Sequence, residues 1–218
     1  MHFVVYSLNK AQKMISHFLK KIAKFSPVRS TLFFFYGRAA SKMSKELAAY
    51  IAPGNHVLDL GCGTGIIAGT VAKTLNASLV GTDVIDIRQV DIPFVLYDGE
   101  KIPFPDKSFD IVLISYVLHH VEKVEILLQE ARRVCRGRII IYEDTPQNLF
   151  HRASCFFHGF SYGSLFGIKK KCAFHTREEW LSLFQKLQLS LMHTQKIKFF
   201  NPVHITARNL FVLSPDVS

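Results

Sequence analysis

A glycine-rich turn between a buried strand and a helix constrains this chain more than any other feature. Residues 57–60 form a short apolar run typical of a buried strand, and Gly61, Gly63 and Gly65 follow it directly. A helix is expected from this turn to about Leu75. Glycines allow the backbone to bend sharply and to approach a ligand closely. Nucleotide-like ligands bind at such strand–turn–helix junctions in α/β sheets. The sequence therefore predicts an α/β fold with a ligand site at this turn.

Strands and helices alternate along the rest of the chain. Further strands are expected at 78–83, 94–97, 110–115, 138–142, 189–197 and 203–213, and helices at 39–51, at 124–134 and from Thr176. Gly137 is interpreted as the residue after a helix cap, and Glu179 completes a capping box with Thr176. Alternating elements imply a mostly parallel sheet with helices on its faces. The last two strands are joined by a short loop, so the final strand must run antiparallel.

The spacing of the glycines indicates which kind of ligand the turn receives. Dinucleotide-binding turns have the pattern G-x-G-x-x-G, whereas here Ile66 occupies the place of the third glycine. The turn is therefore poorly suited to bind a pyrophosphate. This disfavours a nicotinamide-dependent oxidoreductase. Asp59, just before the turn, can accept a hydrogen bond from a ligand amine. A cofactor with an amino-acid end and no phosphate fits this arrangement better.

The segment Val57-Leu58-Asp59-Leu60-Gly61-Cys62-Gly63-Thr64-Gly65 resembles the first motif of class I S-adenosylmethionine-dependent methyltransferases. Three later segments agree in order and spacing: 81–83, 97–110 and 115–120. The resemblance extends from about Ala39 to the C-terminus and is strongest over 55–143, and it favours the type 11-like small-molecule methyltransferases. It implies S-adenosylmethionine as cofactor, bound by Asp59, Gly61, Cys62, Gly63, Gly65, Asp83, Asp98, Gly99 and Ser115.

The same resemblance assigns a fold and roles to these residues. It implies a Rossmann-like three-layer αβα sandwich over 39–218, with a seven-stranded, mostly parallel sheet and an antiparallel last strand. Asp83 would hold the ribose hydroxyls, the segment around Asp98 would place an acid on the adenine amine, and residues 115–120 would line the active site. Methyl transfer is an in-line displacement, so positioning supplies much of the acceleration.

Three side chains at the expected active-site edge are candidates for catalysis. His119 and His120 follow the fourth strand, and Glu143 leaves the fifth. A general base is needed only if the accepting atom carries a proton that must leave. For the histidines the alternative is packing or structural hydrogen bonding, and for Glu143 it is helix capping or solvent exposure.

Residues 144–175 interrupt the alternation of strands and helices. This stretch is rich in Phe, His, Gly and Lys, and we interpret it as a lid or substrate-binding insertion because long connections in compact domains are often functional. Its phenylalanines suit an apolar substrate but serve equally as a helical core face. Its cysteines and histidines match no standard zinc spacing, so no metal is expected.

The N-terminal segment, residues 1–38, is the basic part of the protein. Residues 1–50 contain nine Lys and Arg residues and a single acid, Glu46, and therefore carry most of the net charge of +10. An amphipathic helix is expected at 8–25. It could lie on an anionic membrane surface together with the apolar block up to residue 36, contact RNA phosphates, or pack over the cofactor as a lid. Nucleic acid is disfavoured because no RNA-binding module is recognisable.

These features lead to one main hypothesis for function and location. The four cysteines show no paired spacing, and no apolar run approaches the ~20 residues needed to span a bilayer. A cytoplasmic methyltransferase acting on a small, apolar molecule is expected, with possible peripheral membrane contact through residues 8–36. A catalytically inactive cofactor-binding partner protein and an RNA methyltransferase are the alternatives, and the oligomeric state is left open.

Overall fold

A computed structural model describes residues 26–166, 172–198 and 205–215. The helix expected at 8–25 lies outside the described residues. Among the described residues, no helix is both long and apolar enough to cross a bilayer.

The centre of the fold is one sheet, whose seven described strands run in the order β3-β2-β1-β4-β5-β7-β6. Their bounds are β1 His56–Leu60, β2 Ser78–Asp83, β3 Phe94–Leu96, β4 Phe109–Ser115, β5 Cys135–Asp144, β6 Ser190–Lys196 and β7 Arg208–Ser214. The pairs among β1 to β5 are parallel, and β7 runs antiparallel to both β5 and β6. The expected seven-stranded sheet with an antiparallel last strand is confirmed.

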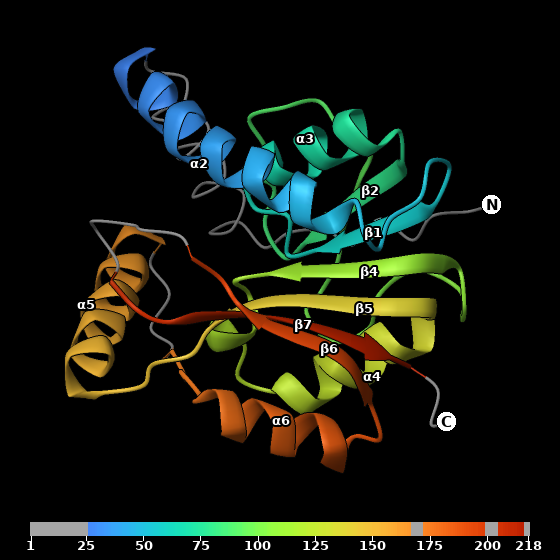
Figure 1. The fold of residues 1–218 in the computed structure, drawn as a ribbon. Coiled ribbons are helices and arrows are strands. Elements are labelled where there is room, and N and C mark those ends of the chain that lie inside the picture. The colour runs from blue at the N-terminus through green and yellow to red at the C-terminus, as the bar shows by residue number, and fades with distance from the viewer. Residues whose placement is uncertain (1–25, 167–171, 199–204, 216–218) are drawn as a thin grey trace.

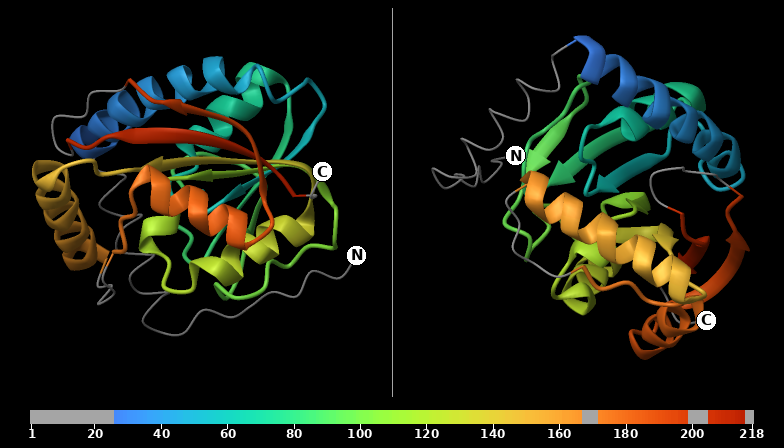
Figure 2. Two further views of the ribbon diagram at one scale, coloured as in Figure 1. Left: turned by 60° about the horizontal axis from the view of Figure 1, so that its bottom comes forward. Right: turned by 90° about the vertical axis from the view of Figure 1, so that its left-hand side faces the viewer.

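Helices cover both faces of this sheet and produce three layers. α2 (Ser26–Leu47) and α3 (Ile66–Leu75) lie on one face, and α4 (Val124–Val134) and α6 (Arg177–Lys186) lie on the other (Figure 1). α5 (Leu149–Phe166) lies beyond the end of the sheet toward which β4 runs (Figures 1 and 2). Side chains alternate between the layers as a strand requires: Val57 packs in the core beneath α2 and α3, and Leu58 in the core beneath α4 and α6.

α2 differs from the helix expected at 39–51. It begins at Ser26 and includes both Pro27 and the apolar block at 32–36, and it ends at Leu47. Proline is tolerated in the first turn of a helix, because backbone N–H groups there have no acceptor within the helix and the missing N–H of proline costs no hydrogen bond. Pro27 therefore lies at the start of α2. The proposed division of the chain at residues 38 and 39 falls inside this helix and stays a prediction.

Gly137 does not follow a helix cap, contrary to expectation. α4 ends at Val134, and Cys135 already has extended backbone and begins β5. A Cβ on Gly137 would lie 2.4 Å from the backbone oxygen of Asp110, where the pairing of β4 and β5 shifts register. The glycine is thus explained by close approach of two backbones. Glycine is suited both to the position after a helix cap and to a close contact between two strands, so the residue type alone does not decide between them.

Replacing Gly137 with alanine is expected to lower the free energy of unfolding by about 1–3 kcal/mol, because a backbone oxygen cannot move aside as a side chain can. Chemical denaturation measures this change. Gly37→Ala is the matched control, since a Cβ there meets nothing within 4 Å and alanine favours a helix by up to about 1 kcal/mol over glycine. Equal stability of the Gly137→Ala protein and the parent would contradict the packing described here.

The start of α6 follows the capping box expected from the sequence. The Thr176 side chain accepts a hydrogen bond from the Glu179 backbone N–H at 3.2 Å, and the Glu179 carboxylate accepts one from the Thr176 backbone N–H at 2.6 Å. Two otherwise unpaired N–H groups are thereby satisfied. This fixes the end of the 144–175 segment against the domain.

Candidate cofactor site and active-site edge

The glycine turn lies between β1 and α3, next to the point where the strand order reverses from β1 to β4. Ligands bind at such switch points in open α/β sheets. Gly61, Gly63 and Gly65 all have positive φ, at 80°, 52° and 73°. A Cβ on Gly61 would also lie 2.5 Å from a Val117 methyl group. Only glycine allows this tight turn, so its sequence pattern has a direct structural cause.

Asp59, the last polar residue before the turn, is a buried carboxylate. Only 2% of its surface is exposed, and its Oδ1 has no hydrogen-bond partner among the described residues. Burial and the nearby Asp83 carboxylate raise the pKa of Asp59 to about 7. Buried polar atoms are almost always paired, so an unpaired carboxylate oxygen beside the glycine turn indicates a place for a cationic or hydrogen-bonding ligand group.

Ser115 lies on the same side of the sheet as Asp59. Asp59 pairs with Leu113 across β1 and β4, and Ser115 is two residues further along β4, so the alternation of the strand gives these residues a common face. The Ser115 hydroxyl is also buried without a hydrogen-bond partner among the described residues. Two unsatisfied polar groups therefore occur at the carboxyl ends of adjacent strands.

Asp83 ends β2 and binds the glycine turn directly. Its Oδ2 accepts a hydrogen bond from the Gly63 backbone N–H at 2.9 Å, and its Oδ1 accepts one from Val84 at 2.7 Å. Burial raises the pKa of Asp83 overall, although these backbone donors act in the opposite direction. Cys62 is buried in the same turn, near Gly81. The predicted residues Asp59, Cys62, Gly63 and Asp83 thus form one cluster.

Asp98 and Gly99 complete this cluster from the loop after β3. Asp98 is exposed, and its Oδ1 accepts hydrogen bonds from the backbone N–H groups of Glu100 and Lys101 at 2.9 and 3.0 Å. Gly99 has a φ of 88°, and a Cβ there would lie 3.2 Å from a Val84 methyl group. The loop therefore packs beside the residue that follows Asp83. Three successive strands, β1, β2 and β3, each bring one carboxylate to this edge.

The three carboxylates at this edge are acceptors that fit a methionine-bearing nucleoside. Asp59 offers an acceptor for an ammonium group, Asp83 offers an acceptor for ribose hydroxyls, and Asp98 offers one for an exocyclic amine. The order of these residues along the sheet edge matches the order of the three groups in S-adenosylmethionine. When bound, this cofactor supplies an electrophilic methyl group on a sulfonium.

The candidate catalytic residues His119 and Glu143 form a buried pair at the same edge. The Nδ1–H of His119 donates to Oε2 of Glu143 at 2.7 Å, and the Leu118 backbone N–H donates to Oε1 at 2.7 Å. His119 is 1% exposed and Glu143 is fully buried. Burial lowers the pKa of His119, but the Glu143 carboxylate more than offsets it, so the pKa is raised. The short helical turn η1 (Leu118–His120) is thereby held to the end of β5.

His120 has a different environment from its neighbour. It is partly exposed, and its Nδ1 lies 3.2 Å from the Cys172 sulfur. His119 instead stacks on Phe174 with ring centroids 4.6 Å apart, and its carbonyl accepts a hydrogen bond from the Ala173 backbone at 2.9 Å. The end of the 144–175 segment therefore contacts both histidines. The catalytic assignments of His119, His120 and Glu143 stay predictions.

Sequence reasoning missed Arg208, which belongs to a further buried pair at this edge. Nε of Arg208 lies 3.0 Å from Oδ1 of Asp144, and both side chains are almost fully buried. The Arg208 guanidinium also lies over the Tyr116 ring, 5.9 Å from its centre. Burial raises the pKa of Asp144 to about 6, although the His119 and Arg208 charges oppose the rise. A lone arginine before the apolar run 210–213 was the available signal.

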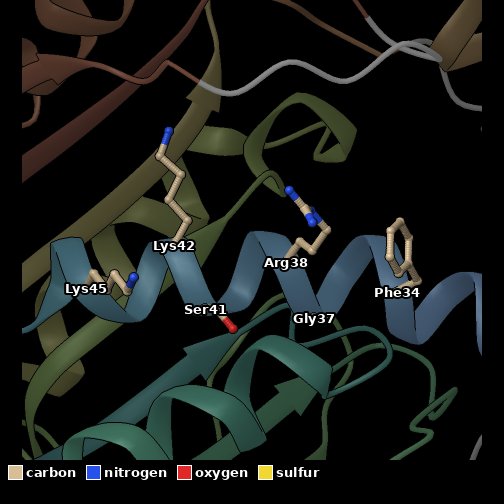
Figure 3. Close-up of a pocket in the computed structure, with 6 residues that line it drawn as sticks. All are labelled: Phe34, Gly37, Arg38, Ser41, Lys42 and Lys45. Atoms are coloured by element: carbon tan, nitrogen blue, oxygen red, sulfur yellow. The ribbon is translucent and has the colours of Figure 1, made fainter.

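A separate depression lies on the surface of α2. It is lined by Phe34, Gly37, Arg38, Ser41, Lys42 and Lys45 (Figure 3). Figure 3 shows Arg38 and Lys42 extending from the same side of the helix, and Lys42 donates a hydrogen bond to the Lys198 carbonyl. No residue of the glycine turn belongs to this depression, so it is distinct from the candidate cofactor site.

Fold and site together define a class I, Rossmann-like methyltransferase domain. Residues 58–141 match a family model described as a methyltransferase domain. Residues 58–141 are therefore similar to the methyltransferase domains of this family, whose cofactor is S-adenosylmethionine. A ubiquinone/menaquinone biosynthesis C-methyltransferase, UbiE, of Paraburkholderia xenovorans is 33% identical over 160 residues, which are 65% of this chain and 65% of that protein. The chain thus matches just under two thirds of this relative's length.

Solved structures share the fold at much lower sequence identity. The geranyl diphosphate C-methyltransferase of Streptomyces coelicolor, solved with S-adenosyl-L-homocysteine, has a TM-score of 0.65 at 11% identity and covers 96% of this chain and 100% of its own. The [4+2]-cyclase SpnF has a TM-score of 0.62 at 14% identity, covering 81% of this chain and 80% of its own. A protein named as a cyclase shares this architecture, so the fold alone does not define the reaction.

The raised pKa of Asp59 predicts a pH-dependent affinity for the cofactor. The cofactor's ammonium group favours the ionised carboxylate, so affinity should fall by up to about tenfold per pH unit below pH 7 and level off above it. Calorimetric titration across this range measures the effect, and Asp59→Asn should abolish most of the slope. An affinity independent of pH in the parent protein would contradict the role given to Asp59.

The raised pKa of Asp59 also predicts how the stability of the ligand-free protein depends on pH. The native carboxyl of Asp59 binds its proton more tightly than the unfolded one, whose reference pKa is 3.8. Its contribution to stability is therefore present at low pH and is lost as pH rises from about 4 to 7. Asp59→Asn should remove this part of the pH dependence of unfolding.

Proposed function

We propose that the protein transfers the methyl group of S-adenosylmethionine to a small, apolar molecule. The observation that carries the proposal is the buried Asp59 carboxylate beside the glycine turn, whose Oδ1 has no partner among the described residues, with Asp83 bound to that turn. The printed names of the similar proteins support a small-molecule substrate: they include quinone-biosynthesis and geranyl diphosphate C-methyltransferases. The phenylalanines of residues 144–175 support an apolar one.

In the proposed reaction, an electron pair of the acceptor forms a bond to the methyl carbon while the carbon–sulfur bond breaks. The sulfur keeps that bond's electron pair, and an acceptor that carries a proton releases it to a base or to water. The chain's main task is to align acceptor and methyl group. Asp59, Asp83 and Asp98 hold the cofactor, and the edge formed by Ser115 and residues 116–120 faces the acceptor.

The geometry supports different roles for the three candidate catalytic residues. Glu143 is enclosed and bonded to both Leu118 and His119, and this supports a positioning role for the pair. His120 is partly exposed, and this supports direct contact with substrate or with the departing proton. A general base at this place would contribute only if the acceptor carries a proton.

An assay with cofactor labelled in its methyl group tests the proposal. The purified full chain would be incubated with a cell extract, and the products would be separated into a solvent-extracted fraction and an RNA fraction. We expect label in the solvent-extracted fraction and none with the Asp83→Ala control. Cofactor binding without any transfer would indicate an inactive cofactor-binding partner, and label in RNA would indicate an RNA methyltransferase. Either result would contradict the proposal.

Peripheral membrane contact through residues 8–36 and a cytoplasmic location also stay proposals. Within the described part of that segment, Phe34 and Tyr36 are exposed. Exposed aromatic residues next to basic ones are typical of helices that lie on a membrane surface. Nucleic acid as a partner stays disfavoured on the sequence argument alone.

A further inference from the structure

The first half of α5, residues 149–157, exposes its large apolar side chains and turns Ser154 and Cys155 toward the protein. Leu149 is 84% exposed, and Phe150, Phe156 and Phe157 are between 64% and 69% exposed. A helix that covers a globular core shows the reverse arrangement. Packing within the domain does not explain why the apolar side chains of this helix face outward.

The inward side of α5 is fixed to the segment before β7. The Ser154 hydroxyl accepts a hydrogen bond from the Ile205 backbone N–H at 3.0 Å. Cys155 is 1% exposed, and its sulfur lies 3.6 Å from the Thr206 hydroxyl. The first turn is closed by the Asn148 side chain, which accepts a hydrogen bond from the His151 backbone at 2.8 Å. These contacts hold the helix with its apolar side facing outward.

The exposed residues form one stripe and are not scattered. Positions 149, 150, 156 and 157, with the exposed Ala153 between them, follow the spacing of a single helical face. We call these five residues the α5 apolar stripe. Contiguous apolar patches of this kind on a soluble protein mark interaction sites for proteins, membranes or ligands.

The sequence that contains the α5 apolar stripe indicates which partner fits it. The sequence from residue 145 to residue 177 contains no Asp or Glu, but it contains Arg152, Lys169, Lys170, Lys171 and Arg177. Arg152 lies on α5 itself and is exposed. An apolar helix face of phenylalanine and leucine, with lysine and arginine close by in the sequence, is typical of helices that lie in the interface of an anionic bilayer.

We propose that the α5 apolar stripe docks on an anionic phospholipid bilayer. α5 lies at the edge of the sheet where the parallel strands end (Figures 1 and 2), so docking would bring the edge that carries Ser115 and His120 close to the bilayer surface. The proposal concerns a surface distinct from residues 8–36. It holds whether or not the protein transfers methyl groups.

Vesicle co-sedimentation of the full chain tests this docking. Vesicles of phosphatidylcholine alone would be compared with vesicles of phosphatidylcholine and phosphatidylglycerol, at low and high salt. We expect binding to the anionic vesicles that weakens with salt. Phe156→Ser with Phe157→Ser should lower the partition coefficient by about tenfold or more, since burying one phenylalanine stabilises by about 1.5–3 kcal/mol and 1.4 kcal/mol is tenfold.

A matched control removes two exposed apolar side chains elsewhere. Ile126 on α4 and Met192 on β6 are 40% and 55% exposed, and Ile126→Ser with Met192→Ser should leave vesicle binding unchanged.

Sedimentation velocity without vesicles shows whether a second copy covers the α5 apolar stripe. The proposal is overturned if the parent binds neither vesicle type, if both double variants bind equally well, or if Phe156→Ser with Phe157→Ser only dissociates a dimer. It is also overturned if binding depends on Lys20 and Lys21 alone.

Discussion

Asp83→Ala is expected to weaken S-adenosylmethionine binding by at least about 100-fold. The carboxylate is assigned to two ribose hydroxyls, and each hydrogen bond to a charged group contributes about 1.5–3 kcal/mol. The substitution also removes the acceptor of the Gly63 backbone N–H, which Asp83 binds at 2.9 Å. The glycine turn would therefore lose both a ligand contact and an anchor. Calorimetric titration with the cofactor measures the loss.

The control for this prediction is a nearby carboxylate outside the cluster. Asp91 is exposed in the same connection between β2 and β3, and Asp91→Ala should bind the cofactor as the parent does. Thermal unfolding without cofactor shows whether the Asp83→Ala protein still folds. A folded Asp83→Ala protein with unchanged affinity would show that the ribose is held elsewhere.

Glu143→Leu should lower the free energy of unfolding by about 3–5 kcal/mol. The backbone N–H groups of Leu118 and Asp144 and the His119 ring all donate to this carboxylate. Removing one partner of a buried charged pair leaves the other uncompensated, and leucine offers no acceptor. Denaturant unfolding measures the loss. Glu178→Leu is the control, because Glu178 is 78% exposed at the start of α6, where the expected loss is below about 1 kcal/mol.

The pH dependence of this loss has a defined sign. The pKa of His119 is raised above its ordinary value of 6.5, so native protein binds this proton more tightly than unfolded protein does. The stability that the pair contributes is complete below about pH 6.5 and declines as pH rises through the raised native value. The difference in free energy of unfolding between the parent protein and Glu143→Leu should therefore become smaller at alkaline pH. A difference that widens with pH would contradict a protonated His119 in the native state.

The sheet and the cofactor cluster could be predicted because their signals are local in the sequence. Continuous apolar runs mark parallel strands that are buried on both faces, and the predicted strand 78–83 has the bounds of β2. Asp59 and the glycines lie within seven residues, and their spacing reflects one turn. Asp83 follows from the strand beside that turn. These elements depend little on how distant parts of the chain pack.

The remaining features depend on long-range geometry. Arg208 meets Asp144 because the two residues are partners across the antiparallel β5–β7 pair, and no local pattern defines that register. Gly137 suits either a helix cap or a close strand contact, and only the position of Asp110 decides between them. The phenylalanines of α5 have helical spacing, but their sequence does not indicate whether the stripe faces inward or outward.

The central claim is that the edge formed by Asp59, the glycine turn and Asp83 receives S-adenosylmethionine. Calorimetric titration of the purified full chain with the cofactor tests it most directly, with S-adenosylhomocysteine as competitor. Saturable binding that the competitor displaces is the predicted result. The absence of any binding heat, with no displacement and no thermal shift, would contradict the assignment of the site.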